Sequence, residues 1–263
     1  MSLKDYERPS LTTDMVLFRI NETDSGNNRK NTNKVLQVLL IQRDIEPQAG
    51  KWSLPGGFVE IDEEIGNNVL RKLNEKTGIS GDFYTEQLYT FGAIDRDERG
   101  RVISVSYLGL VNEANYTNVG GSAKQLWVDI DDAMDIDLAF DHKEIIKYAI
   151  QRIQGKAEYT DILFNMMPTE FTIHDVQMVY EMMLGKKMDN FKRRINKYIT
   201  PLNKMRAGKQ FFIALIVPIN DDVCVFIIRH LYLCHSLCAI KKMFDSNFFS
   251  INFNHLTLPP YSR

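Results

Sequence analysis

The chain has 263 residues, of which 44% are hydrophobic and 25% are charged, and its formal net charge is −2. This composition indicates a globular protein with material for one large or two modest domains. No apolar run is long enough to span a bilayer and the first residues do not resemble a signal peptide, so we expect a cytoplasmic location. All three cysteines, Cys224, Cys234 and Cys238, fall near the C-terminal end, which excludes a disulfide framework for the rest of the chain.

The first part of the chain predicts strands separated by polar loops. Residues 13–20 alternate loosely between apolar and polar side chains, and residues 35–43 are almost continuously apolar, as in a strand covered on both faces. Residues 21–34 between them are rich in asparagine, aspartate, glycine and lysine and predict a loop. Residues 52–57 are apolar at first and end in a glycine pair. This predicts a strand that runs into a turn, where the absence of side chains lets the backbone approach a ligand closely.

A helix of about four turns is predicted next. Asp62 is a good N-cap residue, Glu63 and Glu64 lie in the first turn, where the helix dipole favours acids, and Gly78 stands where a left-handed C-cap residue belongs.

Two strands and a second helix are predicted after it. Residues 83–93 and 102–112 are strand-like and are joined by a charged turn. The helix begins at Asp141 as N-cap, has Glu144 at the capping-box position and carries an apolar stripe, and Gly155 can close it.

The spacing of residues 57–79 resembles that of the Nudix box. That many matches at fixed spacing are far more specific than a lone glycine motif. The resemblance implies a mixed sheet between the box helix and a last helix, an α/β/α sandwich over about residues 10–155. The matching residues are Gly57, Glu63, Arg71, Leu73, Glu75, Gly78 and Ile79.

Two positions depart from the box. Nudix hydrolases carry three carboxylates here that hold Mg²⁺ or Mn²⁺, whereas this chain has Lys72 and Lys76 beside Glu75. The formal charge of this helix face changes from −3 to +1, so we expect no metal, no cofactor and no catalytic residue. Lysine binds phosphate as a point charge, so the face can attract a nucleotide. The alternative is that both lysines form only a solvated helix face.

The pattern changes after residue 155. Residues 156–170 contain an apolar segment too short for a core of its own, which should dock a second domain on the first. Thr172, with an acid three residues on, caps a helix that Gly185 ends. A tight turn leads to a second helix at residues 190–200. Its predicted inward-facing residues are Phe191, Ile195 and Ile199.

Basic residues concentrate in the second helix of this pair and in the segments on either side of it. From Gly185 to Arg206 there are eight basic residues and one acid. A helix-turn-helix needs this arrangement, because Arg and Lys neutralise phosphates and Arg or Asn reach base edges. An ordinary helical hairpin with a solvated basic helix is the alternative. The candidate DNA-binding residues are Lys187, Lys192, Arg193, Arg194, Asn196 and Lys197.

Residues 91–102, 138–142, 171–181 and 184–194 are similar to the Nudix-related bacterial transcriptional regulators of NAD and pentose metabolism. In that family a degenerate Nudix domain senses a metabolite and a winged helix binds DNA. The resemblance implies operator DNA as a partner, a homodimer, and as effector either an ADP-ribose-like nucleotide or a pentose such as arabinose.

The same resemblance divides the chain into a ligand-sensing domain at residues 1–155 and a winged-helix domain at residues 156–210. The residue after Asp141, His142, is better explained as a partly buried histidine behind a helix cap, although that cap can also border a ligand cleft. The implied ligand-binding residues are Arg43, Trp52, Gly56, Gly57, Lys72, Glu75, Lys76 and Asp141.

Residues 211–263 form an atypical tail. They contain seven of the fifteen phenylalanines but no glycine and no glutamate, and the resemblance stops after Gly208, where the regulators carry a wing. So abrupt a change predicts a disordered or out-of-frame extension. Cys234, His235 and Cys238 lack a fourth ligand at zinc-site spacing, so no metal is expected there.

A ligand-responsive transcriptional regulator is therefore the first hypothesis. The second is a hydrolase of ADP-ribose-like nucleoside diphosphates, which would hold Mg²⁺ or Mn²⁺ with Glu60, Glu63, Glu64 and Glu75. A scaffold or partner-binding protein is the third.

Overall fold

The computed structural model describes residues 6–24, 32–112, 114–206 and 208–214. Its main sheet contains β1 (Ser10–Asp24), β2 (Thr32–Gln42), β3 (Trp52–Ser53), β4 (Gly56–Phe58), β6 (Tyr84–Phe91), β7 (Val102–Val111) and β9 (Gln125–Asp129). The strand order is β3-β2-β1-β7-β6, with β4 paired to β1 and β9 paired to β2. Only β1 and β7 run parallel, and the other described pairs in this sheet are antiparallel.

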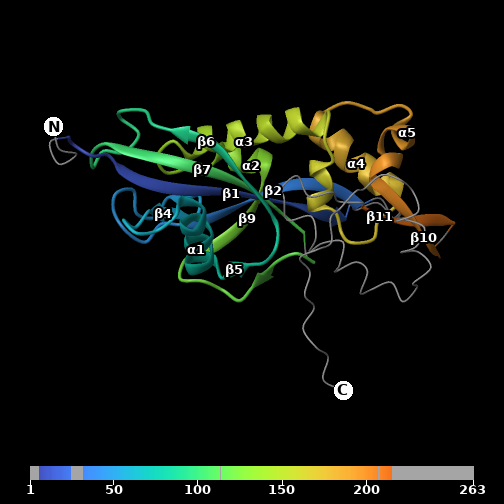
Figure 1. The fold of residues 1–263 in the computed structure, drawn as a ribbon, viewed down its shortest axis with the longest axis horizontal. Helices are drawn as coiled ribbons and strands as arrows, with labels where there is room; N and C mark the ends of the chain where they lie inside the picture. The colour runs from blue at the N-terminus through green and yellow to red at the C-terminus, as the bar shows by residue number, and fades with distance from the viewer. Residues whose placement is uncertain (1–5, 25–31, 113, 207, 215–263) are drawn as a thin grey trace, which may run out of the picture. The chain divides into compact units, whose positions relative to one another are not determined.

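Helices cover both faces of this sheet. In Figure 1, α1 (Ile65–Thr77) lies below the sheet and α3 (His142–Ala157) lies above it. Successive residues of β1 point to opposite faces, so Met15 and Leu17 pack under α1, whereas Val16 and Phe18 join the core on the other side. This is the α/β/α sandwich that the box resemblance implied, and that prediction is confirmed.

The box helix α1 begins later than predicted. Ile65 is its first residue and Glu64 its N-cap, because Asn68 donates hydrogen bonds back to the Phe58 carbonyl (2.9 Å) and to Glu63 (2.7 Å). These bonds fold the preceding loop against the helix, so Asp62 does not cap it. The predicted C-cap is confirmed, since Gly78 has a φ of 70° and its N–H donates to Asn74 O over 2.7 Å. A short two-stranded sheet of β5 (Ile79–Ser80) and β8 (Thr117–Asn118) follows α1.

The last helix of the sandwich also differs in detail. The N-cap of α3 is Asp141 as predicted, but neither its side chain nor Glu144 makes a capping bond. Gly155 does not end the helix, which continues to Ala157 because that residue is fully buried against the core. Burial there outweighs the cost of about 1 kcal/mol for glycine inside a helix. The acidic stretch before Asp141 contains a helix that the sequence did not predict, α2 (Ile130–Asp135).

The C-terminal part is a winged helix. It contains η2 (Ile162–Met166), α4 (Ile173–Leu184), α5 (Phe191–Ile195), η3 (Asn196–Tyr198), β10 (Ile199–Arg206) and β11 (Lys209–Ala214). The capping box at Thr172 and the left-handed Gly185 (φ 63°) are both confirmed. The predicted second helix is shorter than expected, because η3 replaces its end and Ile199 already begins β10. Phe191, Ile195 and Ile199 are buried, as predicted.

The wing is present, although the sequence led us to expect a departure from the family there. Strands β10 and β11 pair antiparallel and are joined through Gly208, whose φ is 75°. Phe212 exchanges backbone hydrogen bonds of 2.8 and 3.1 Å with Phe171, which ties the wing to the start of α4. Residues 211–214 therefore belong to the wing and not to a tail, while the rest of that predicted tail lies outside the described residues.

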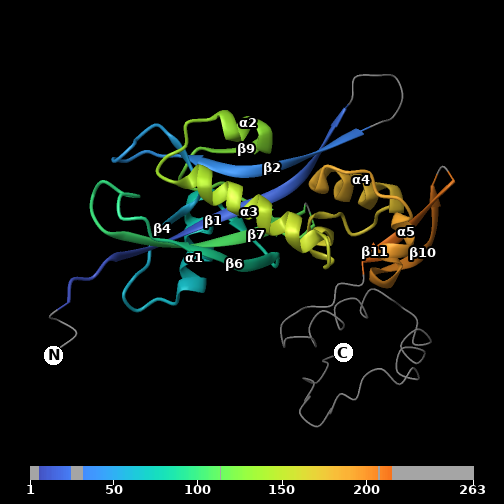
Figure 2. The ribbon, with the colours of Figure 1, turned by 90° about the horizontal axis from the view of Figure 1, so that it is seen from above.

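The apolar segment η2 lies between the sandwich and the winged helix. Leu163 and Phe164 are buried in a core that is shared by β1, α3 and α4, and Figure 2 shows α3 passing along the sheet toward the winged-helix elements. Over the described residues, no helix combines the length and apolar character needed to cross a membrane.

Candidate functional site

Two acids of the box, one before α1 and one in it, form ion pairs with basic residues of α1. Arg71 donates to both oxygens of Glu63, each over 2.6 Å, and to Glu75 over 2.8 Å. Lys72 Nζ lies 3.2 Å from the second oxygen of Glu75. Hydrogen bonds from Arg71 and Asn68 lower the pKa of Glu63 to about 2, and the bond from Arg71 also lowers the pKa of Glu75. The positive charges thus sit where a metal would be needed.

The other acids of the hydrolase hypothesis lie on the same side of the box. Glu60 is 3.9 Å from Arg71, and Glu64 is the N-cap of α1. Among the described residues, no cluster of three or more His, Cys, Asp and Glu side chains could hold a metal ion. Lys76 lies half-buried in the last turn of α1, where its carbonyl accepts the Ala123 N–H over 3.0 Å.

Two consecutive glycines connect α1 with strand β1. A Cβ on Gly56 would lie 2.2 Å from the Thr13 carbonyl and 2.5 Å from Asp14 Oδ1. A Cβ on Gly57 would lie 3.0 Å from the side chain of Lys72. The sequence predicts a close approach to ligand at this turn, and in the structure both glycines also approach the protein's own strand and helix closely.

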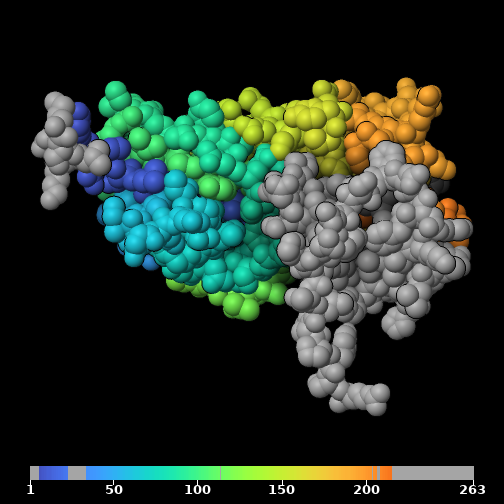
Figure 3. Space-filling view, in the orientation of Figure 1, coloured from blue at the N-terminus to red at the C-terminus, as the bar shows by residue number. Residues whose placement is uncertain are grey.

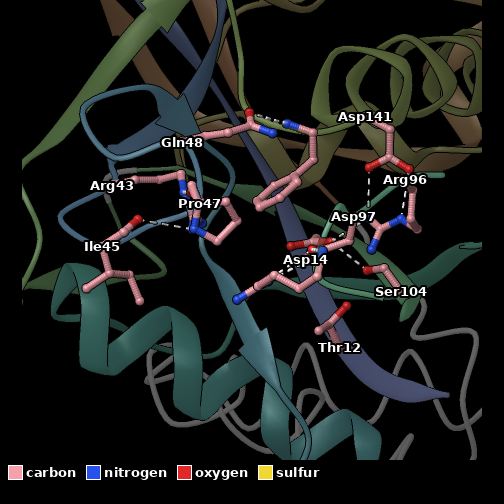
Figure 4. A network of polar contacts seen from close by, with 12 residues as sticks. Thr12, Asp14, Arg43, Ile45, Pro47, Gln48, Arg96, Asp97, Ser104 and Asp141 are labelled. Atoms are coloured by element: carbon pink, nitrogen blue, oxygen red, sulfur yellow. Dashed lines mark hydrogen bonds and ion pairs between the residues drawn. The ribbon is translucent and has the colours of Figure 1, made fainter. Parts of the chain in front are cut away.

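A cluster of buried charged and polar residues lies beside this turn (Figure 4). Ser104 Oγ donates to Asp14 Oδ2 over 2.5 Å, and Arg96 makes a two-pronged ion pair with Asp141, at 2.7 and 2.9 Å. Arg96 also lies 3.6 Å from Asp14. Arg96 therefore engages the Asp141 carboxylate, which explains why this N-cap residue makes no side-chain capping bond with α3.

His142 is the buried histidine of the alternative interpretation. Its Nδ1 accepts the Leu54 N–H over 2.9 Å, and its Nε2 is 3.6 Å from Asp14 Oδ1. Burial lowers the pKa of His142, so the ring is neutral near pH 7 and carries its proton on Nε2. The ring thereby joins the glycine turn to the first residue of α3.

Two guanidinium groups face one aromatic ring at the edge of this cluster. Arg43 Cζ is 4.8 Å and Arg99 Cζ is 5.9 Å from the centre of the Phe140 ring. Asp97 binds Arg99 through bonds of 2.7 and 2.9 Å. Burial, and then the neighbouring charge of Arg99, lower the pKa of Arg43. The cluster brings three arginines and three aspartates together beside an aromatic face, and its guanidinium groups and that ring suit a phosphate-bearing aromatic ligand.

The structure places several of the implied ligand-binding residues near one another. Arg43 and Asp141 belong to the charged cluster, and the glycine pair joins that cluster to Lys72. Trp52 lies in β3, where its carbonyl accepts the Ala139 N–H over 2.9 Å beside Phe140, and Lys124 Nζ is 5.6 Å from the centre of its ring.

Phe140, Arg96, Asp97, Arg99 and Asp14 were not predicted. The charged turn that supplies three of them resembles an ordinary solvated hairpin turn, although an acid inside the apolar strand β1 was a signal for Asp14.

The candidate DNA-binding residues of the winged helix fall into two groups. Those exposed to solvent are Lys187, Lys192, Arg193, Asn196 and Lys197. Arg194 instead points to the protein, where it donates to the carbonyls of Ala157 (2.7 Å) and Glu158 (2.6 Å) and lies over the Tyr180 ring. This contact differs from our expectation that all the basic residues of the helix are left outside.

Glu181 shapes the turn between α4 and α5. It accepts the Met188 N–H over 3.0 Å and the Gln177 amide over 2.8 Å, and Lys187 Nζ lies 3.5 Å from it. The tight turn that a helix-turn-helix requires is therefore held by side chains of α4.

Comparison with known proteins identifies the same two parts, the α/β/α sandwich and the winged helix. Residues 27–149 match the NUDIX domain family and residues 163–210 match the NrtR DNA-binding winged helix domain family. The ADPR responsive transcriptional repressor NtrR of Acinetobacter baylyi is 37% identical over 198 residues, which are 73% of this chain and 74% of that protein.

Solved structures give the same result. The crystal structure of Shewanella oneidensis NrtR has a TM-score of 0.66 and 32% identity, and the match covers 78% of this chain and 94% of that chain. The same protein complexed with a 27mer DNA has a TM-score of 0.63 and 30% identity, with coverage of 78% and 93%. The chain therefore belongs to the NrtR family of transcriptional repressors, which join a Nudix domain to a winged-helix DNA-binding domain.

Proposed function

We propose that this chain is a repressor that binds ADP-ribose in its Nudix domain and operator DNA through its winged helix, in the cytoplasm. The name of the Acinetobacter relative supports ADP-ribose as effector, and the Shewanella complex with a 27mer DNA supports DNA as partner. The observation that carries the proposal is the pair of guanidinium groups facing Phe140. A nucleoside diphosphate has phosphates that these guanidinium groups can bind and a ring that can contact Phe140.

The proposed ligand site is formed by the charged cluster and the lysine face of α1. Arg43 and Arg99 bind the diphosphate, Phe140 contacts an aromatic or sugar ring, and Lys72 reaches the phosphates from the side of the glycine turn. Lys76 lies one turn further along α1 and adds positive charge. A neutral pentose such as arabinose is the rival effector, and it would gain little from these cations.

We propose that the site binds without hydrolysing. Glu63 and Glu75 are engaged by Arg71 and Lys72, so a divalent cation would first have to displace two fixed positive charges. Hydrolysis of ADP-ribose and similar diphosphates in the presence of Mg²⁺ or Mn²⁺ should therefore stay at background. Release of AMP that depends on Glu75 would instead support the hydrolase hypothesis.

The proposed DNA surface consists of α5, the turn before it and the wing. Lys192, Arg193, Asn196 and Lys197 are exposed on or just after α5, and Lys187 precedes it. One such short helix reads few bases, so we propose that a homodimer binds two half-sites separated by whole turns of DNA. Sedimentation of the protein–DNA complex should show two chains for each operator.

The proposal is tested by titrating the protein onto DNA from upstream of its own gene and onto random duplex. We expect a preference for the upstream duplex, an affinity that falls steeply with salt, and release by ADP-ribose without divalent cations but not by arabinose. Arg43→Gln should weaken ADP-ribose binding, whereas the matched control Lys51→Gln, at a partly exposed lysine paired with Asp137, should not. Equal affinity for both duplexes, or equal release by arabinose, would contradict the proposal.

A further inference from the structure

Arg194 lies in the basic helix α5, but its side chain points toward the protein and not toward the outer surface of the helix. Its guanidinium donates to the carbonyls of Ala157 and Glu158, at the C-terminal end of α3, over 2.7 and 2.6 Å. The last carbonyls of a helix have no partner within the helix and carry partial negative charge, so a cation is favoured there. The centre of the Tyr180 ring of α4 is 5.6 Å from the guanidinium carbon. Arg194 thus joins the recognition helix to the end of α3.

The other end of α3 lies at the ligand site. Asp141, the N-cap, is paired with Arg96, and His142, the first residue, accepts the Leu54 N–H of the segment that leads into the glycine turn. Phe140, which faces Arg43 and Arg99, directly precedes the N-cap. A ligand that moves Phe140 or competes for these arginines therefore acts on the N-terminal end of α3.

Between its ends α3 is a continuous buried helix. Its 16 residues extend over about 24 Å, and Ile145, Ile146, Ala149 and Ile153 are fully buried against the sheet. In Figure 3 the yellow surface, which includes α3, adjoins the orange surface of the winged helix. A packed helix of this kind moves as a unit, so a displacement at one end reaches the other.

We infer that Arg194 is a positioning residue that transmits ligand binding from the N-terminal end of α3 to the recognition helix, and that it is not a DNA contact. The inference rests on the proposed function, because it describes how the proposed ligand alters the proposed DNA binding. Such coupling between two sites changes affinities by about 5–150-fold.

Other polar contacts hold α4 and the turn after it on the sandwich. Gln154 donates to the Met183 carbonyl over 3.1 Å, and Lys186 pairs with Glu158 at 3.0 Å. Removing the Arg194 guanidinium leaves these contacts in place. Its loss therefore removes this polar link between α5 and the end of α3 without detaching the winged helix.

The experiment compares Arg194→Gln with Lys192→Gln, a neutralisation of an exposed cation on the same helix. For each full-length variant, operator affinity is measured with and without ADP-ribose, and ADP-ribose affinity is measured separately. In Arg194→Gln we expect ADP-ribose affinity within twofold of the wild type and a ratio of the two operator affinities close to one. In Lys192→Gln we expect weaker operator binding but the wild-type ratio. Arg194→Lys, which keeps a cation near the carbonyls, should restore part of the ratio.

A second measurement covers the case in which Arg194→Gln does not bind DNA at all. Hydrogen exchange at residues 191–199 is followed with and without ADP-ribose in the absence of DNA. The wild type should show a ligand-dependent change there, and Arg194→Gln should not. A wild-type operator ratio or a wild-type exchange response in Arg194→Gln overturns the inference. A wild type that binds no ADP-ribose, or that keeps its operator affinity in its presence, instead contradicts the proposed function.

Discussion

Phe191 holds the short recognition helix, and its truncation to alanine measures how far α5 depends on the domain core. The side chain is 3% exposed and its ring centre is 5.2 Å from that of Tyr180. A buried aromatic side chain removes about 150–250 Å² from water. At ~25 cal/mol per Å² this is worth about 4–6 kcal/mol, close to the roughly 3–5 kcal/mol that Phe→Ala substitutions cost. Because α5 has five residues, it cannot persist without this packing.

We therefore expect Phe191→Ala to cost about 4 kcal/mol in winged-helix stability, which is roughly a thousandfold in the equilibrium between ordered and disordered α5. Operator affinity, measured by fluorescence anisotropy, should fall by about a hundredfold or more. ADP-ribose affinity, measured by calorimetry, should stay within about twofold of the wild type, because Phe191 touches none of the ligand-site residues. The control Phe191→Leu keeps most of the apolar volume and should cost less than about 1.5 kcal/mol. Wild-type operator affinity in Phe191→Ala would refute the reasoning.

Three further predictions concern the ligand site, the core and the wing. Lys72→Glu with Lys76→Glu should weaken metal-free ADP-ribose binding by about tenfold or more while the melting temperature holds, and unchanged affinity would identify the lysines as a solvated face. Burial lowers the pKa of His142 below the ~6.5 of the unfolded chain, so stability should be constant above pH ~6.5 and fall as the unfolded chain takes up its proton below that pH. Urea unfolding at pH 5.5 and 7.5 should show a smaller loss in His142→Gln, and an equal loss would exclude this histidine as the cause. A chain that ends at Ala214 retains Phe212 and the wing, so it should keep both ligand binding and operator binding, and failure of either by calorimetry or anisotropy would show that residues 215–263 are required.

Local patterns were sufficient for the order and type of most elements. Gly78 and Gly185 were predicted as left-handed C-caps because a helix that ends needs a residue that tolerates positive φ. Phe191, Ile195 and Ile199 were predicted as buried because their spacing places them on one side of a helix. The register of the box positions was enough to predict the Nudix sandwich and to find the two lysines that replace its carboxylates.

The predictions that failed depended on residues far apart in the chain. The second helix of the winged helix was predicted too long because nothing local shows that Ile199 pairs with Ala214 in the wing. Asp141 is the N-cap of α3 as predicted, but its side chain makes no capping bond because Arg96, 45 residues away, binds its carboxylate.

What the sequence determined by itself was which faces of each element are apolar, where helices end, and which charges replaced the metal ligands, since these follow from periodicity and from residue type. Only the tertiary structure decided which partner each long charged side chain reaches. Arg193 and Arg194 are adjacent and chemically identical, yet one is exposed and the other binds the end of α3. The physical reason is that an arginine side chain satisfies its donors with any acceptor within several ångströms, and only folding determines which acceptor that is.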